Sequence, residues 1–465
     1  MHTSTSVGRA GLFDRDHRLV IIGTISLVAL AAFEAMAVTA AMPTVADALD
    51  GLALYPLAFA LPLAAGIVGM AVGGNRSDVR GPFGSLLGGV AVFAAGLVAA
   101  GLAPNMLVLA LGRGVQGFGS GVFIVALYVV VAQRFPATLQ PRVFAAFAGA
   151  WVIPALVGPA VAGLIVEHIG WRWVFLGVPA LAVVALGLLV PSLSGSLRKQ
   201  GTDPADPQAQ KRIGWSVVAA VAATALHLAG QEQSGALLAV AFVTIGIAGL
   251  IVAVPRLLPR GTSRMRPGLP AVVAMRGVVS AAFVTAEVLV LLLLNRERGL
   301  SPGTAGLALT AAAIAWSAGS WWQGRDAVSI PRWRIAQIGS LSLVMGIGGS
   351  ALVTIPEVPV FVALPTWALS GLGMGMVMPT LSLLTLSASD AGDEGRNTSA
   401  LQISDALAST IALAVTGTAF LALLEAGGSI AYVVGFVAAA SLAAFGVAQA
   451  HRMAAAERDS STASA

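Results

Sequence analysis

The sequence predicts an all-α polytopic membrane protein with fourteen transmembrane helices. Hydrophobic residues fill 57% of its 465 positions, charged residues fill only 10%, and the mean hydropathy is +0.88. A soluble protein of this size needs a polar surface that 26 basic and 21 acidic residues cannot provide. The apolar residues also form runs of about 20, the length that crosses a hydrocarbon core as a helix. A soluble fold is therefore excluded.

The first half of the chain contains six such runs and then a polar break at 194–212. The first run is too long for the core of a signal peptide, so we interpret it as a retained span. The break contains two aspartates and two prolines, a composition typical of a loop between two membrane units. We predict spans at 19–42, 53–74, 84–103, 106–131, 144–166 and 173–193.

Eight further spans follow, and the first two of them flank a short polar turn. Merging these two into one helix over 213–255 would give a length of about 65 Å, far more than a bilayer requires. We predict spans at 213–231, 236–255, 268–294, 303–322, 335–354, 358–385, 398–423 and 429–449.

The distribution of basic residues predicts the orientation. With fourteen spans, the basic loop 256–266 lies on the same side as the N-terminus, and only Arg172, Arg296 and Arg298 lie on the other side. Basic loops stay in the cytoplasm, so we predict that both termini are cytoplasmic and that the protein lies in a bacterial inner membrane. The net charge of +5 then reports topology, and we expect no nucleic-acid partner.

Several kinds of chemistry have no support in the sequence. The chain has no cysteine, which excludes disulfides, thiolate nucleophiles and cysteine-ligated metals. It also has no Walker sequence, metal-ligand cluster or nucleophile triad. We therefore expect no enzyme activity, metal or cofactor, and an ion gradient remains as the source of energy.

Four segments stand out from the apolar background. The loop after the second span reads Gly-Asn-Arg-Ser-Asp-Val-Arg-Gly over 74–81, and the fourth span contains a glycine-rich run around Arg113. The fifth span contains Pro154 and then Gly-Pro-Ala-Val-Ala-Gly over 158–163. The first span contains Glu34 and ends at Pro43.

Together these segments resemble the major facilitator superfamily, specifically its fourteen-span drug:proton antiporter branch, along nearly the whole chain. The resemblance implies two six-helix bundles that rock around a central cavity, with two extra helices at the periphery. We predict bundles at 1–193 and 268–450, a central loop with two extra spans at 194–267, and a disordered cytoplasmic tail at 451–465.

The resemblance also assigns two motifs. The loop motif implies a gate, which we place at Asp78 because the family's basic residues are displaced here; its members are Gly74, Asp78, Arg80 and Gly81. The fifth-span motif is typical of antiporters and implies a kink that lets this helix seal against a neighbour in the other half. Its members are Pro154, Gly158, Pro159 and Gly163.

Ionisable groups inside predicted spans are the candidates for coupling and substrate binding, because a charge near the bilayer centre costs roughly 2.5–3.5 kcal/mol. The candidates are Glu34, Arg113, His227, Glu287 and Asp405, although His227 lies in one of the two extra spans and is more simply a histidine at the lipid interface. A buried carboxyl can alternate between a protonated and a cation-bound state. The resemblance supports Glu34, at the position of the family's first-span acid, and Arg113, in the family's Arg-x-x-x-Gly motif.

Each candidate has a structural alternative. Glu34 could have a purely structural role, as a hydrogen-bond partner of a neighbouring helix. Arg113 could form a structural ion pair. Glu287, in the counterpart of the first span, could pair with an outer arginine, and Asp405 could be a solvated acid near a helix end. Further candidates for lining the cavity are Gln116, Met36, Trp151, Trp316, Trp367 and Met374.

We expect a proton-driven exporter of amphipathic, cationic small molecules that acts as a monomer. Its partners would be the substrate, protons and the lipid bilayer. A dedicated exporter of a lipid, siderophore, antibiotic or metabolite on the same fold remains open, as does a membrane sensor that transports nothing.

Overall fold

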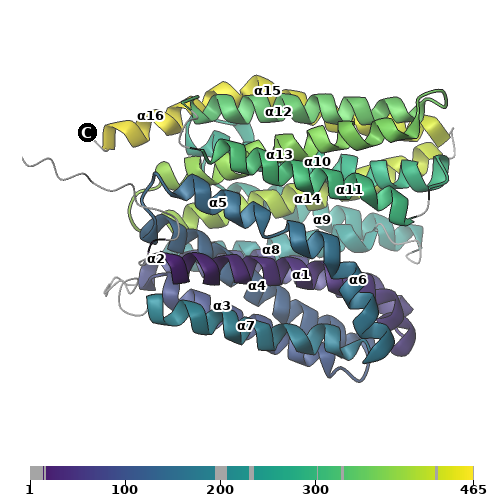
Figure 1. Ribbon diagram of the computed structural model, residues 1–465, viewed down its shortest axis with the longest axis horizontal. Coiled ribbons are helices and arrows are strands. Elements are labelled where there is room, and N and C mark those ends of the chain that lie inside the picture. The colour runs from purple at the N-terminus through teal and green to yellow at the C-terminus, as the bar shows by residue number, and fades with distance from the viewer. Residues whose placement is uncertain are drawn as a thin grey trace, which may run out of the picture.

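The computed structural model describes residues 14, 17–193, 207–229, 235–300, 302–325, 329–424 and 428–463, and the regular structure among them is helical (Figure 1). The helices up to the central break are α1 (Arg18–Ala48), α2 (Tyr55–Arg80), α3 (Pro82–Gly101), α4 (Met106–Arg134), α5 (Gln140–Gly149), α6 (Val152–His168) and α7 (Arg172–Leu193). The later helices are α8 (Pro207–Ala229), α9 (Ala236–Leu257), α10 (Leu269–Leu292), α11 (Pro302–Gln323), α12 (Arg332–Ala351), α13 (Ala363–Ser387), α14 (Glu394–Leu424), α15 (Gly428–Gln449) and α16 (Ala454–Ala463).

Fourteen membrane crossings are present, as predicted. Thirteen segments in the described part of the chain are long and apolar enough to span a membrane, and α5 and α6 together form one of them. The fourteenth crossing is α11, which has 22 residues and packs along α13. Its glycine, serine, threonine and tryptophan residues make it less apolar than the other spans.

The spans pack around two main apolar cores. One core is built from helices before α8, and the other is built from α10 to α16. Helices α8 and α9 pack against each other, and α8 contacts both α2 and α14. The α8–α9 pair therefore lies beside the two bundles and covers one side of their interface.

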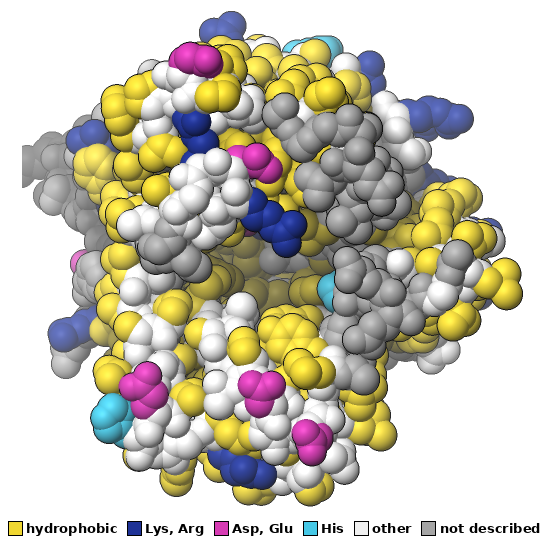
Figure 2. All heavy atoms as spheres, turned by 90° about the vertical axis from the view of Figure 1, so that its right-hand side faces the viewer, with side chains coloured by type: hydrophobic (Ala, Val, Ile, Leu, Met, Phe, Trp, Pro, Cys, Tyr) yellow, Lys and Arg dark blue, Asp and Glu magenta, His cyan; other side chains and the backbone are white. Residues whose placement is uncertain are grey.

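The two bundles meet at one end of the molecule, which we call the closed end. Here α2 contacts α14, and α5 contacts α11 and α13. Leu383 and Leu386, near the end of α13, belong to the apolar core of the first bundle. The opposite face is hollowed near its centre, with hydrophobic side chains inside the hollow and a basic side chain at its rim (Figure 2). We call this face the hollow end.

The C-terminal segment differs from the prediction of a disordered tail, which is wrong for residues 451–463. The chain continues as a short 3-10 turn (Ala450–Met453) and then as α16. Met453 and Ala456 are fully buried, and Glu457 accepts a hydrogen bond of 3.0 Å from the backbone nitrogen of Arg332. Alanine-rich sequence has high helix propensity, and these contacts hold the helix against the second bundle.

Glycine allows close contact between helix backbones, as it does in many membrane proteins. A Cβ atom at Gly117 of α4 would lie 2.1 Å from the carbonyl oxygen of Pro62 in α2. A Cβ atom at Gly375 of α13 would lie 2.0 Å from the carbonyl oxygen of Trp316 in α11. Each bundle thus depends on at least one glycine at a helix crossing.

Substitution Gly117→Ala should therefore destabilise the protein, because α2 and α4 would have to separate. Overpacking of this kind costs about 1–3 kcal/mol, which should lower the unfolding temperature in detergent. The matched control is Gly88→Ala in α3, where a Cβ would meet no atom within 4 Å. That substitution should leave the unfolding temperature unchanged or raise it, and equal effects from both would contradict the packing argument.

Candidate functional site

A buried polar triad joins α1 to α4 inside the first bundle. The Arg113 guanidinium forms an ion pair with the Glu34 carboxylate and also donates to the Gln116 side-chain oxygen at 2.6 Å. The Gln116 amide nitrogen donates to the other Glu34 oxygen at 2.8 Å. All three residues are at least nine-tenths buried. The triad therefore neutralises its own charge, although the buried Nε of Arg113 has no hydrogen-bond partner among the described residues.

The sequence dictates part of this arrangement. Arg113 and Gln116 lie three residues apart on α4 and so project from the same face of that helix. Glu34 lies 79 residues before Arg113, and the packing of α1 near α4 brings it into contact. The structure thus identifies Glu34 as the acid that Arg113 faces, which the sequence left open. Their role in coupling stays a prediction.

A second ion pair lies in the second bundle and includes a residue that the sequence analysis missed. The Arg276 side chain of α10 donates to Asp405 of α14 at 2.8 Å and to the Met378 carbonyl of α13 at 3.2 Å. Tyr128 of α4, in the first bundle, also interacts with Arg276. Asp405 is therefore paired and is not a solvated acid. The position of Arg276, eight residues into the predicted span 268–294, is the sequence signal that could have identified it.

Glu287 stands alone. No hydrogen bond or ion pair joins its carboxylate to any residue that the structure describes, and its side chain is partly exposed. The alternative pairing with Arg298 is not formed, because Arg298 donates to the carbonyls of Pro356 and Val358. Arg276 and Glu287 lie three helical turns apart on one face of α10, the face that meets Tyr128 of the other bundle. Glu287 is thereby directed toward the space between the bundles.

Asp78 connects the bundles at the closed end. Its two carboxylate oxygens accept hydrogen bonds of 2.7 Å each from the backbone nitrogens of Gly395 and Arg396, at the start of α14. A carboxylate at a helix N-terminus is stabilised by the exposed N–H groups and by the helix dipole. A Cβ at Gly74 would lie 2.5 Å from the Gly395 carbonyl oxygen, so the approach of the two helices requires glycine.

The other members of the loop motif have separate roles. Gly81 connects α2 to α3 with a φ of 79°, a left-handed conformation that favours glycine. The Arg80 side chain is exposed. Within the described part of the chain, the closed-end contact of this motif is made by Asp78 and not by Arg80.

The fifth-span motif breaks its helix. The crossing divides into α5 and α6 at Ala150–Trp151, and Ala150 lies four residues before Pro154, where the proline ring obstructs the helical carbonyl. Pro159 lies inside α6 without interrupting it. A Cβ at Gly158 would lie 3.1 Å from Met36, so the close contact of α6 there is with α1 of its own bundle.

The expected seal against the other half is therefore formed mainly by α5, which packs on α11 and α13, with a smaller contact between α6 and α11. Gly163 takes no part in close packing, since a Cβ there would meet no atom within 4 Å.

The candidates for lining the cavity divide into two groups. Trp151 is 42% exposed at the helix break, and Met36 and Trp316 are partly exposed. Trp367 and Met374 are fully buried in the second core, so the prediction that they line a cavity is wrong. Their side chains point into the bundle, with Trp367 stacked on Phe283 at a centroid distance of 4.9 Å.

A family model and several bacterial relatives match this sequence. The family model described as Major Facilitator Superfamily matches residues 24–413. The chain is 26% identical over 449 residues to a protein of Mycobacterium tuberculosis named "Probable multidrug-efflux transporter", covering 92% of both chains. It is also 27% identical over 175 residues to a multidrug transporter protein of Bacillus subtilis, but that match covers only 32% of the relative's length.

Solved structures share the fold at low sequence identity. The human organic anion transporter MFSD10 superposes with a TM-score of 0.70 at 14% identity, covering 93% of this chain and 99% of that one. The proton:xylose symporter XylE superposes with a TM-score of 0.63 at 16% identity, covering 92% and 95%. These likenesses establish the architecture alone.

Substitution Arg113→Met should strongly destabilise the protein, because it leaves the Glu34 carboxylate buried without its counter-ion. Breaking a buried ion pair on one side costs about 3–5 kcal/mol. The double substitution Glu34→Gln with Arg113→Met should recover part of this loss, and unfolding in detergent measures both. Additive losses from the two single substitutions would contradict a direct pair.

Substitution Asp78→Asn should weaken the closed end, because a neutral amide is a poorer acceptor for the two N–H groups of α14. Spin labels on cysteines introduced at the ends of α2 and α14 measure the separation, with no background because the chain has no cysteine. We expect a larger population with separated bundles. The control is Asp390→Asn, which removes the charge of an exposed acid in the loop before α14 that makes no side-chain hydrogen bond to Asp78, Gly395 or Arg396. An unchanged distance distribution in Asp78→Asn would rule out this latch.

Proposed function

The chain belongs to the Major Facilitator Superfamily of membrane transporters, and from its embedded acids we propose that it is a proton-coupled exporter of amphipathic, cationic small molecules. The proposal rests chiefly on Glu287. Two other embedded carboxylates, Glu34 and Asp405, have arginine partners, whereas this one has no partner among the described residues.

An isolated carboxylate in an apolar environment needs either a proton or a cation. Glu287 is partly exposed and lies on the face of α10 directed toward the other bundle. A proton and a cationic substrate would then compete for one group. Such competition couples the two movements, because binding of one excludes the other.

The shape of the molecule supports alternating access. The hollow end is open between the bundles, while Asp78 and the packing of α5 hold the closed end together (Figure 2). Under the predicted orientation the hollow faces the outside of the cell. In this state a proton would enter and displace the substrate, and the protonated carrier would return to the state that opens inward. Coupling requires that each ligand favours one state over the other.

The triad and the second ion pair have supporting roles in this scheme. Protonation of Glu34 would release Arg113, so the triad offers a second place where a proton changes helix contacts. Arg276 of the Arg276–Asp405 pair also contacts Tyr128 of the other bundle, so this contact would be lost when the bundles separate. Export, rather than uptake, is supported by the names of the relatives and by the fifth-span motif.

Transport in proteoliposomes with an imposed pH gradient tests the proposal, with the fluorescent lipophilic cation ethidium as the probe. Substitution Glu287→Gln should reduce uphill transport at least about tenfold, because the glutamine cannot exchange a proton for a cation. Glu287→Asp should keep part of the activity. The control is Glu297→Gln, an exposed acid at the far end of the same helix, which should transport normally.

Proton release from purified protein on addition of ethidium gives an independent readout. The wild-type protein should release protons and Glu287→Gln should release fewer. Uphill transport that persists undiminished in Glu287→Gln, with normal proton release, would refute the assignment. Transport of a neutral or anionic compound alone would refute the cationic substrate class.

A further inference from the structure

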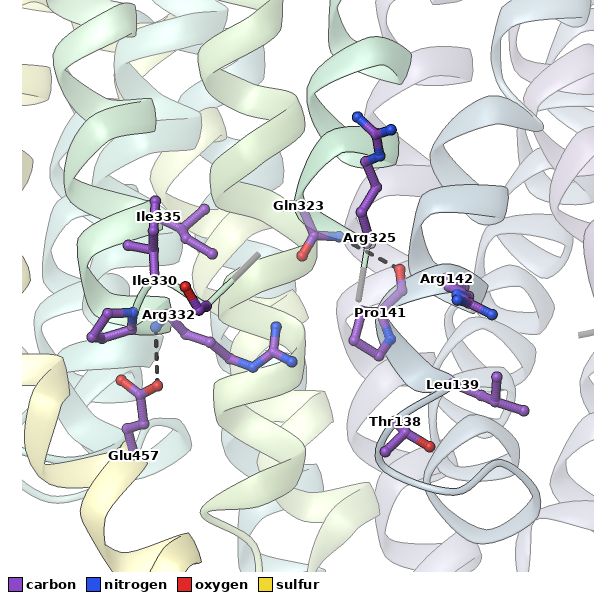
Figure 3. A pocket seen from close by; sticks show the side chains of 13 residues that line it. Thr138, Leu139, Pro141, Arg142, Gln323, Arg325, Ile330, Arg332, Ile335 and Glu457 are labelled. Carbon is purple, nitrogen blue, oxygen red and sulfur yellow. Dashed lines mark hydrogen bonds between the residues drawn. The ribbon is translucent and has the colours of Figure 1, made fainter. Parts of the chain in front are cut away.

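A cavity of about 660 Å³ lies at the closed end, between the two bundles (Figure 3). The first bundle contributes the loop before α5 and its first turn, with Thr138 and Arg142. The second bundle contributes the end of α11, the start of α12 and Glu457 of α16. None of the residues assigned to coupling, gating or the fifth-span motif lines it. The cavity is therefore separate from the proposed transport site.

The lining is basic. Among the described lining residues are Arg142, Arg325 and Arg332 and one acid, Glu457, so the formal charge of this part of the wall is positive and favours an anion. The Arg332 guanidinium extends across the cavity toward the α5 side, whereas Arg325 points away and lies 4.4 Å over the Trp321 ring (Figure 3). The first turns of α5 and α12 also border the cavity and direct their positive dipole ends to it. Arg332 is thus the principal cation for a ligand.

A buried acceptor in the same cavity has no partner. Gln323 is only 2% exposed, and its side-chain nitrogen donates to the carbonyls of Ser320 at 3.1 Å and Pro141 at 3.5 Å. Because both partners are acceptors, the amide nitrogen must face them, and the side-chain oxygen points away from them. That oxygen is buried and has no hydrogen-bond partner among the residues that the structure describes. A buried acceptor of this kind costs free energy unless a ligand supplies a donor.

The surroundings indicate where the ligand comes from. The lining residues lie at the ends of helices long enough to span the membrane, and the predicted orientation would place these ends at the level of the cytoplasmic lipid head groups. Leu139 adds apolar surface to the wall on the α5 side, and Ile330 and Ile335 add it to the wall on the α12 side. The cavity therefore combines a cation, an acceptor and an apolar border, which fits an amphipathic ligand with a phosphate and a hydroxyl group.

We propose that this cavity binds a glycerol phosphate group, with the phosphate on Arg332 and a glycerol hydroxyl donating to Gln323. The group comes either from phosphatidylglycerol in the membrane or from free glycerol phosphate. Since walls from both bundles form the cavity, the ligand binds when the closed end is closed and stabilises that state. The site does not depend on which compound the protein exports.

Native mass spectrometry of the full chain in detergent tests the site. Titration with phosphatidylglycerol should give a saturable complex, and phosphatidylcholine, which has a phosphate but no hydroxyl donor, should bind more weakly. Substitution Arg332→Gln should weaken phosphatidylglycerol binding about tenfold, the loss expected for one charge-assisted contact. Arg332→Lys should retain part of the affinity, which separates the loss of charge from a folding defect.

The matched control is Arg334→Gln, which removes the same charge from the same turn of α12. Arg334 stacks on Trp333 and does not line the cavity. The substitution Arg334→Gln should therefore leave phosphatidylglycerol binding unchanged. Equal losses in Arg332→Gln and Arg334→Gln would show general attraction by basic residues and overturn the site, as would an absence of saturable binding.

Free glycerol phosphate distinguishes the two sources. If free glycerol phosphate competes with phosphatidylglycerol, and if this competition is lost in Arg332→Gln, the site is supported and the head group alone is sufficient for binding. Binding of the lipid without such competition would support the membrane as the source. Spin labels at the ends of α5 and α12 should in either case show a larger closed population when ligand is added, and a smaller one would contradict binding between the bundles.

Discussion

A charge inside the membrane must be neutralised within the protein, because lipid offers it neither water nor counter-ions. This constraint determines how both bundles are joined internally. Glu34 and Arg113 connect α1 with α4, and Arg276 and Asp405 connect α10 with α14. Each pair satisfies its charges only while its two helices stay together. The pairs therefore make each bundle behave as a unit that can move as a whole.

In the first bundle, the buried charges are neutralised by residues of the same bundle. In the second bundle, the charged pair also has a contact across the interface. The Glu34 triad lies within its own bundle, whereas Arg276 also contacts Tyr128 across the interface. At the closed end, Asp78 uses backbone N–H groups of the opposite bundle in place of a basic side chain. Contacts of this second kind break when the bundles separate and re-form when they meet. Some polar contacts thus stabilise a single bundle, and others stabilise the conformation in which the two bundles meet at the closed end.

Sequence reasoning predicted the helices well because each span is a continuous apolar run, and a charge within such a run is easy to see. It predicted Glu34 and Arg113 as special residues but could not pair them, since their contact depends on how α1 packs near α4. It missed Arg276, whose position near a helix start resembled that of a loop arginine.

The burial of aromatic and methionine side chains was also beyond the sequence. Nothing in the pattern distinguishes Trp367, which points into its bundle, from Trp151, which lies exposed at a helix break. The tail was mispredicted for a related reason. Its polar composition does not reveal the small apolar face, with Met453 and Ala456, that docks α16.

The position of the α8–α9 pair makes the two seams between the bundles unequal. On one seam, α8 packs against both α2 and α14, so protein separates that side of the interface from lipid. The other seam is formed by α5, α6 and α11, with the helix break at Ala150–Trp151 beside it. The extra helices therefore cover only one of the two seams between the bundles. A compound dissolved in the membrane would therefore meet two different seams, one covered by α8 and one formed by α5, α6 and α11.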